Sequence, residues 1–276
     1  MENYKNQLII FSKNRACQLS LLLDSLKRNS PLLFDKISVL YKTDSEDYLC
    51  GYQKVFDKYP NVYFNNEKNF RNNLFQLIDD NIAATTFMVD DAVVYNKILA
   101  RKIDIIRPVV EDYVIFSLRL GKNCNYSHPA NLHYELGEHE IDGEYITFDY
   151  TKQQNGDFRY PLSTDGHIFN TKLIKDLLIE IDFSNPNTLE AFLQRFVVTN
   201  SIPKIMKSFT ESKLVSIPVN LVNDTFNNRY GLEFGIHEKE LNDKFISGET
   251  IDLNAMDFSG VNGPHKEIKY EFKNES

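Results

Sequence analysis

The sequence predicts an α/β protein with a mostly parallel central sheet, flanked by helices and joined to a smaller mixed lobe. Three observations predict it. Short apolar runs alternate with helical patterns over the first hundred residues, an acidic pair, Asp90-Asp91, directly follows the fourth apolar run, and the alternation stops after Pro108. Consecutive strand–helix–strand units favour a parallel sheet, because their right-handed crossovers bring the chain back to the same sheet.

The elements of the first half follow from hydrophobic spacing. Short apolar runs that end in polar residues are typical of buried parallel strands. Leucines three and four residues apart indicate a helix that ends before Pro31. The pattern predicts strands over residues 7–12, 37–41, 62–64 and 86–89, and helices over residues 16–29, 45–58 and 70–78.

The second half is less regular. The patterns predict strands over residues 113–118, 145–150 and 213–218, and helices over residues 171–180, from 187 to about 197, and around 238–245. No repeat or low-complexity linker separates residues 1–108 from residues 109–276. We therefore expect two halves of one continuous domain.

Composition excludes several classes of protein. The 276 residues carry 39 acidic and 31 basic side chains, and 42% are hydrophobic, which is typical of a globular chain. A net charge of −8 without a basic block argues against nucleic-acid binding. No apolar run is long enough for a signal peptide or a membrane span. The odd set Cys17, Cys50 and Cys124 indicates free thiols, so we expect a cytoplasmic protein.

Polar residues follow each predicted parallel strand. Ligands of such sheets bind beyond the carboxyl ends of the strands, which here are residues 12–15, 42–44, 65–67 and 90–91. Asp90 and Asp91 are adjacent carboxylates at a buried strand end, and their repulsion calls for a divalent cation or a basic partner. The alternative is that an Asp caps the following segment.

Five blocks of sequence carry a family resemblance. FSKNRACQL (residues 11–19), MVDDAV (88–93), SLRLGKN (117–123), PLSTDGH (161–167) and NPNTLE (185–190) resemble conserved blocks of GT-A fold glycosyltransferases, in their bacterial family-2-like branch. The resemblance implies a Rossmann-like sheet and transfer of a sugar from a nucleotide-sugar donor, UDP- or GDP-linked, to a glycan or other hydroxyl acceptor. It also implies assistance by Mn²⁺ or Mg²⁺. Our own hypothesis is that the transfer inverts the configuration at the sugar carbon, and retention is the alternative. Residues 1–108 would bind the donor and residues 109–276 the acceptor.

The sequence departs from the family pattern at one position, because Ala92 replaces the last Asp of the family's Asp-x-Asp motif.

The resemblance assigns roles to particular residues. Asp91 and His265 would hold the metal, and Asp165 or Glu190 would be the catalytic base. Arg119 and His167 would contact acceptor or sugar. The nucleotide-binding residues would be Ser12, Asn14, Arg15, Lys42, Glu67, Arg71 and Asp90.

Several of these residues also have a structural interpretation. Glu190 stands three residues after Asn187, as in a helix capping box. Glu67 and Arg71 are at helical spacing and could simply pair with each other. His265 could belong to a mobile tail.

Two other functions stay open. A nucleotidyltransferase that makes nucleotide sugars would share the parallel sheet and the acidic site, but residues 11–18 contain none of the glycines of its usual phosphate loop. A binding module without turnover is the second alternative, which Ala92 keeps open. The sequence does not indicate the oligomeric state.

Overall fold

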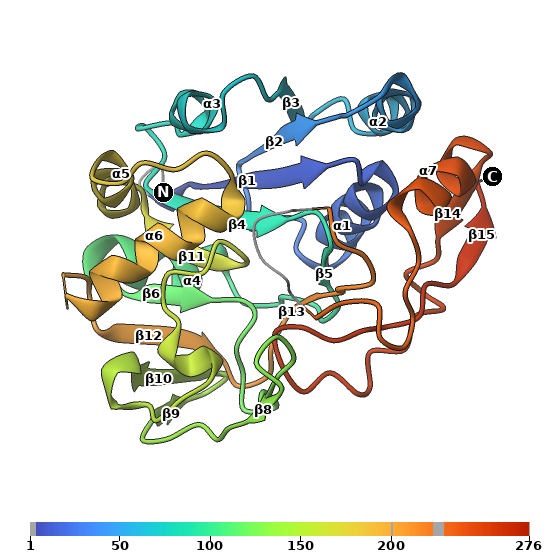
Figure 1. Ribbon diagram of the computed structural model, residues 1–276. Helices are drawn as coiled ribbons and strands as arrows, with labels where there is room; N and C mark the ends of the chain where they lie inside the picture. The colour runs from blue at the N-terminus through green and yellow to red at the C-terminus, as the bar shows by residue number, and fades with distance from the viewer. Residues whose placement is uncertain (1–3, 200, 223–228, 276) are drawn as a thin grey trace.

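The computed structural model describes residues 4–199, 201–222 and 229–275 (Figure 1). Nine strands within these ranges form one sheet, in the order β3-β2-β1-β4-β11-β6-β12-β10-β9. Helices cover both faces of this sheet (Figure 1). The predicted α/β class with a mostly parallel central sheet is therefore confirmed.

The first four strands of the main sheet are parallel and in register at their carboxyl ends. They are β1 (Asn6–Lys13), β2 (Lys36–Lys42), β3 (Tyr63–Asn66) and β4 (Ala84–Val89). Phe11 of β1 pairs with Leu40 of β2 and with Val89 of β4. Because these strands point the same way, the loops that follow β1, β2 and β4 emerge side by side at one edge.

The remaining strands extend the same sheet into the second half of the chain. β11 (His167–Asn170) lies antiparallel between β4 and β6 (Ile115–Ser117). β12 (Ile205–Phe209) lies next to β6 and is parallel to it. β10 (Tyr145–Asp149) pairs antiparallel with β12, and β9 (Glu140–Asp142) pairs antiparallel with β10 at the end of the sheet. The two halves thus share one sheet, and the expected division at residue 108 falls inside helix α4 (Lys102–Glu111).

Alternating side chains of the strands build two hydrophobic cores. Leu8 and Ile10 face one core, whereas Ile9 and Phe11 face the other, as expected for successive residues of a strand. The first core is covered by α1 (Ala16–Asn29), α2 (Glu46–Lys58), α4 and α7 (Glu238–Ile246), and the second by α3 (Phe70–Leu77), α5 (Thr171–Ile179) and α6 (Pro186–Val198).

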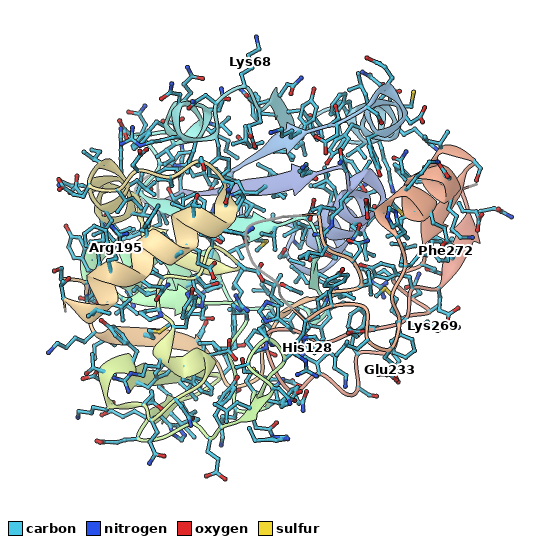
Figure 2. All side chains as sticks on the ribbon, viewed as in Figure 1. Lys68, His128, Arg195, Glu233, Lys269 and Phe272 are labelled. Carbon is cyan, nitrogen blue, oxygen red and sulfur yellow. The ribbon has the colours of Figure 1, made fainter. Side chains whose placement is uncertain are left out.

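Three small two-stranded sheets lie beside the main one. β5 (Ala92–Val94) pairs with β13 (Leu214–Ser216), β7 (Tyr126–Ser127) with β8 (Leu132–His133), and β14 (Glu249–Ile251) with β15 (Phe272–Asn274). Short 3₁₀ helices span Tyr150–Lys152 and Asp157–Arg159. Ser216 also bridges to His265, which brings the C-terminal segment back to the end of β4. In Figure 2 the side chain of His128, on the loop after β7, lies near this C-terminal segment.

Some elements differ from the sequence prediction. The helix expected from residue 187 begins at Pro186, because Asn185 rather than Asn187 caps it. Helix α4 and strand β12 were not predicted at all. Pro108 was interpreted as a break, yet it lies within α4, and Lys207 and Ser208 interrupt the apolar pattern of β12. In the part of the chain that the structure describes, no helix is both long and apolar enough to cross a membrane.

Candidate active site

A pocket of about 850 Å³ opens at the carboxyl ends of the parallel strands. Its walls come from the loops after β1, β2 and β4, from the start of α6, and from the C-terminal segment around His265. A cleft of this size is typical of a small-molecule site. Ten predicted site residues line it, namely Ser12, Arg15, Lys42, Glu67, Asp90, Asp91, Arg119, Asp165, Glu190 and His265.

The acidic pair is bound to Arg15. Nη1 of Arg15 lies 3.1 Å from Asp90 Oδ1 and 3.1 Å from Asp91 Oδ2, and Nη2 donates to the backbone oxygen of Asn220 at 2.6 Å. The backbone N–H of Lys13 donates to Asp90 Oδ2 at 3.1 Å. The sequence predicted that either a divalent cation or a basic partner offsets the repulsion between these carboxylates. In this arrangement the basic partner is Arg15.

Burial and charge act in opposite directions on this cluster. Burial raises the pKa of the Asp91 carboxyl to about 6 and also raises the pKa of Asp90, while the Arg15 guanidinium opposes both shifts. Burial by itself would lower the pKa of Arg15, but the two carboxylates more than compensate and raise it. The guanidinium therefore stays charged in a site where only 8% of its side chain is exposed.

The loop after β1 is fixed by Asn14, which does not line the pocket. Asn14 has a φ of 56°, in the left-handed region that Asn tolerates better than most residues. Its Nδ2 donates to Asp44 Oδ2 and its Oδ1 accepts from the Asp44 N–H, both at 2.9 Å. Asn14 thus joins the loops after β1 and β2 and holds the backbone from which Arg15 projects.

Ser12, Lys42 and Glu67 form the side of the pocket near β1 and β2. Ser12 Oγ and Tyr52 Oη are hydrogen-bonded at 2.5 Å. Lys42 Nζ lies 3.8 Å from Glu67 Oε1. Burial raises the pKa of Glu67, and Lys42 opposes that shift. Glu67 pairs with Lys42, so the alternative pairing with Arg71 is not the one observed.

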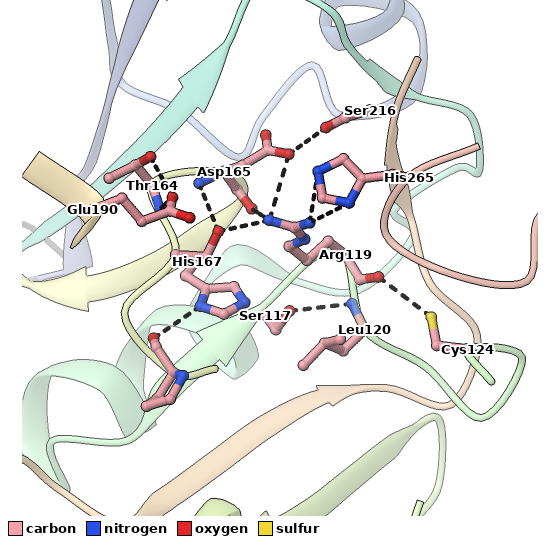
Figure 3. A network of polar contacts seen from close by, with 12 residues as sticks. Ser117, Arg119, Leu120, Cys124, Thr164, Asp165, His167, Glu190, Ser216 and His265 are labelled. Carbon is pink, nitrogen blue, oxygen red and sulfur yellow. Dashed lines mark hydrogen bonds and ion pairs between the residues drawn. The ribbon is translucent and has the colours of Figure 1, made fainter. Parts of the chain in front are cut away.

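A second arginine, Arg119, organises the opposite wall of the pocket (Figure 3). Its Nη1 donates to Ser163 Oγ at 2.6 Å and lies 3.6 Å from Asp165 Oδ2. Ser216 Oγ also donates to Asp165 Oδ2. Burial raises the pKa of the Asp165 carboxyl to about 6, against the opposing effects of Arg119 and Ser216. Asp165 is therefore a buried carboxylate held by a cation and a hydroxyl.

Gly166 allows this wall to form. It has a φ of 77°, and a Cβ placed there would lie 2.2 Å from Cδ2 of Leu214. Only glycine adopts that conformation without strain in so little space. The turn directs Asp165 toward Ser216 and leads the chain into β11.

Glu190 is bound to the loop that carries Asp165. Its Oε2 accepts from the backbone N–H of Thr164 at 2.7 Å and from the Thr164 hydroxyl at 2.6 Å (Figure 3). The capping box of α6 is formed by Asn185 and Thr188, so the structural interpretation of Glu190 as a capping residue was wrong. The carboxylate is available to the pocket instead.

The two histidines have different surroundings. His265 lines the pocket, and its ring nitrogens lie 3.3 and 3.4 Å from Nη2 of Arg119. Burial and the Arg119 charge lower the pKa of His265 well below its usual value, so the imidazole is neutral. His167 lies outside the pocket lining, with its Nδ1 2.9 Å from the backbone oxygen of Pro161. Burial lowers its pKa to about 3.

Arg71 is the third predicted residue, with Asn14 and His167, that does not line the pocket. Its Nε donates to the backbone oxygen of Ile181 at 3.3 Å, and its guanidinium lies over the rings of Phe75 and Phe183. These contacts attach α3 to the segment that follows α5.

The protein groups around Asp91 do not fit the metal shell that the resemblance implies. Within residues 4–199, 201–222 and 229–275, no three His, Cys, Asp or Glu side chains are grouped to hold a metal ion. Arg15 and Lys13 bind three of the four carboxylate oxygens of the acidic pair, which leaves Asp91 Oδ1 without a partner. His265 faces Arg119. The divalent cation thus stays a prediction from the resemblance.

Several pocket residues were not predicted from the sequence. Ser216 and Asn220 bind Asp165 and Arg15, while Asp157 and Tyr160 line the wall near Glu190. Burial raises the pKa of Asp157. β13 and the segment after it carry no distinctive motif, so only the pairing of β13 with β5 could reveal these contacts.

One curated protein is similar to this chain over most of the chain's length. No protein-family model matches the chain. The bifunctional glycosyltransferase pgtA of Dictyostelium discoideum is 24% identical over 287 residues, which cover 90% of this chain and 37% of pgtA. The chain thus spans little more than a third of the length of that relative.

Solved structures are more distant. The crystal structure of S. aureus TarS 1-349 has a TM-score of 0.49 and 12% identity, covering 77% of this chain and 60% of the other. TarS 1-349 in complex with UDP-GlcNAc has a TM-score of 0.45 and 14% identity, covering 76% and 57%. A 4-diphosphocytidyl-2C-methyl-D-erythritol synthase from Anaerococcus prevotii has a TM-score of 0.43 and 14% identity, covering 78% and 92%.

The topology of the main sheet and the similarity to pgtA both agree with the GT-A resemblance of the five sequence motifs. The sheet carries its polar loops at the carboxyl ends of the parallel strands, and pgtA is similar over nine-tenths of the chain. The chain therefore has the fold of the nucleotide-diphospho-sugar glycosyltransferases.

Proposed function

We propose that this protein transfers a sugar, as a hexosyl group, from a nucleotide-diphospho-sugar to a hydroxyl acceptor in the pocket. One observation carries the proposal. The pocket joins the strand-end loops that hold Arg15 and the acidic pair to a facing wall that presents two carboxylates, Asp165 and Glu190. The similarity to a glycosyltransferase supports it.

The donor would lie against the loops after β1, β2 and β4. Ser12, Lys42 and Glu67 line this side together with Asp90 and Arg15, and they offer both hydrogen-bond donors and acceptors to a base and a ribose. A UDP- or GDP-sugar is the expected donor, as the resemblance implies. A glycan is the expected acceptor, and it would enter from the side of Glu190.

Transfer with inversion needs one base. The acceptor hydroxyl loses its proton to a carboxylate while its oxygen attacks the anomeric carbon, and the nucleoside diphosphate leaves with the electron pair of the broken C–O bond. We assign this role to Glu190. Thr164 holds Oε2 of Glu190, and Ser216 and Arg119 hold Oδ2 of Asp165, so these contacts leave one oxygen of each carboxylate unoccupied. Protonation of Asp165 would remove the counter-charge of the buried Arg119, which favours Glu190 as the base.

Asp165 would then act on the reaction by positioning Arg119. Its carboxylate and Ser163 hold the guanidinium at the pocket wall, where it offers positive charge to a ligand. The alternative assignment, with Asp165 as the base, predicts that kcat rises as the pH passes about 6, because the pKa of Asp165 is raised to about 6. A cytoplasmic location stays a prediction from the three free cysteines.

The proposal can be tested with purified protein and a panel of UDP-, GDP-, CMP- and dTDP-sugars. A donor that binds the native state raises the melting temperature, and release of its nucleoside diphosphate measures turnover. Binding together with release is expected for one class of donor. Binding without release would support the non-catalytic alternative, and pyrophosphate-dependent nucleotide formation would support the nucleotidyltransferase.

A further inference from the structure

The strongest unassigned feature is the position of Arg15 between the two carboxylates of the acidic pair. Asp90 Oδ1 and Asp91 Oδ2 converge on a single nitrogen, Nη1, at 3.1 Å each. Two carboxylate oxygens converging on one point are the arrangement in which a cation is bound. Here that point is occupied by a side chain of the protein itself.

Other contacts lock the guanidinium in this position. Nη2 of Arg15 donates to the backbone oxygen of Asn220 at 2.6 Å, and the backbone N–H of Arg15 donates to Tyr52 Oη at 3.3 Å. Arg15 and Asp90 are almost fully buried, with side-chain exposures of 8% and 4%. Moving the arginine away would leave two buried carboxylates without a cation, which is strongly unfavourable.

We propose that Arg15 is the permanent counter-ion of Asp90 and Asp91, and that a nucleoside diphosphate binds this pocket without a divalent metal ion. The inference rests on the proposed function for the identity of the ligand, but its statement about the carboxylates does not. A hard cation such as Mn²⁺ or Mg²⁺ takes about six oxygen ligands. The acidic pair has one unpartnered oxygen left, Asp91 Oδ1.

Positive charge for the phosphates is available from side chains. Lys13 and Lys42 line the same pocket with exposures of 40% and 49%, and their partners Asp44 and Glu67 can be exchanged for a phosphate. Arg229 lies on the rim and donates to the backbone oxygen of His128 at 3.0 Å. These cations do not depend on a bound metal.

The first experiment uses the wild-type chain. UDP and GDP are titrated by calorimetry in EDTA and then with Mn²⁺, while Mn²⁺ binding without nucleotide is followed by electron paramagnetic resonance. We expect the better-bound nucleotide to have dissociation constants within about threefold of each other in the two conditions, and no protein-bound Mn²⁺. A loss of more than about tenfold in EDTA, or stoichiometric Mn²⁺ binding by the protein alone, would overturn the proposal.

The second experiment removes the counter-ion. Arg15→Gln should create a Mn²⁺ site on Asp90 and Asp91, seen as a paramagnetic signal of bound metal and as a melting temperature that rises with Mn²⁺. Arg15→Lys keeps a charge and should bind no Mn²⁺. Arg101→Gln, at an exposed arginine paired with Asp104, is the matched control and should behave as wild type. An Arg15→Gln chain that folds but binds no Mn²⁺ would contradict the counter-ion role.

The two proposals fail in different ways. If neither nucleotide binds in either condition, the proposed function fails, and the Mn²⁺ measurements on wild type and Arg15→Gln still decide the role of Arg15. If Arg15→Gln does not fold even with Mn²⁺, the wild-type measurements in EDTA and in Mn²⁺ decide it.

Discussion

Thr164 donates two hydrogen bonds to the same oxygen of Glu190, one from its backbone N–H at 2.7 Å and one from its hydroxyl at 2.6 Å. The pair joins the first turns of α6 to the loop that leads into β11. It fixes one carboxylate oxygen and leaves the other free of Thr164. A carboxylate held in this way can accept a proton from a hydroxyl in the pocket.

Glu190→Gln is expected to remove turnover while leaving donor binding intact. Glutamine has the same shape and can still accept from Thr164, but it cannot take up a proton. General-base catalysis contributes about 10²- to 10⁴-fold, so kcat should fall by that factor. Release of nucleoside diphosphate measures kcat, and calorimetry measures the dissociation constant.

Glu180→Gln, at an exposed residue after α5, is the control. Wild-type turnover in Glu190→Gln together with none in Asp165→Asn would assign the base to Asp165.

The pKa of Asp165 predicts a pH-dependent stability. Burial raises this pKa to about 6 in the folded chain, above its ordinary value of 3.8, so the folded state holds the proton more tightly than the unfolded state. The contribution is therefore fully present below about pH 4 and is lost as the pH rises through 6. Its size is about 3 kcal/mol.

Asp165→Asn removes this titration. The difference in unfolding free energy between wild type and variant should fall as the pH rises from about 4 to about 6, and urea titrations at several pH values measure it. A difference that does not change over this range would contradict the raised pKa.

The parallel half of the site could be predicted because strand direction alone places its residues. Ser12 lies at the carboxyl end of β1, Arg15 follows β1, and Asp90 and Asp91 follow β4. The register of these parallel strands at Phe11 brings the four residues together. That Arg15 lies between the two carboxylates could not be predicted, because this depends on where α1 begins. The backbone oxygen of Asn220 adds a contact from a residue 205 positions away.

The second half was harder to predict because its contacts come from irregular segments. Asp165 and Glu190 were recognised as candidates, but Ser216 reaches Asp165 only because β13 pairs with β5 beside the acidic pair. α6 begins one residue earlier than expected, because Asn185 caps it instead of Asn187. Its capping-box partner is then Thr188, and not Glu190, whose spacing from Asn187 had indicated that role.

Arg119→Met should destabilise the fold because it leaves the buried Asp165 carboxylate without its cation. Breaking a buried ion pair by removing one partner costs about 3–5 kcal/mol. Urea denaturation measures the loss, and Arg101→Gln at the surface should change stability by less than about 0.5 kcal/mol. The double variant Arg119→Met with Asp165→Asn should lose less than the sum of the single variants, because the uncompensated charge is gone. Strict additivity would show that the two side chains are not coupled.

Asn14 offers a test of how the loop after β1 is held. Asn14→Ala removes both hydrogen bonds to Asp44 and places an ordinary Cβ at a φ of 56°. The left-handed conformation costs about 1–2 kcal/mol for such a residue, and the lost hydrogen bonds add about 1 kcal/mol each. Asn14→Gly loses the same hydrogen bonds without that backbone strain, so its unfolding free energy should lie between those of wild type and Asn14→Ala.

Both variants should also weaken donor binding, because Arg15 follows directly in the chain. Equal stability of the two variants would show that backbone conformation at this position contributes nothing, and unchanged donor binding in both would show that Arg15 is held without Asn14.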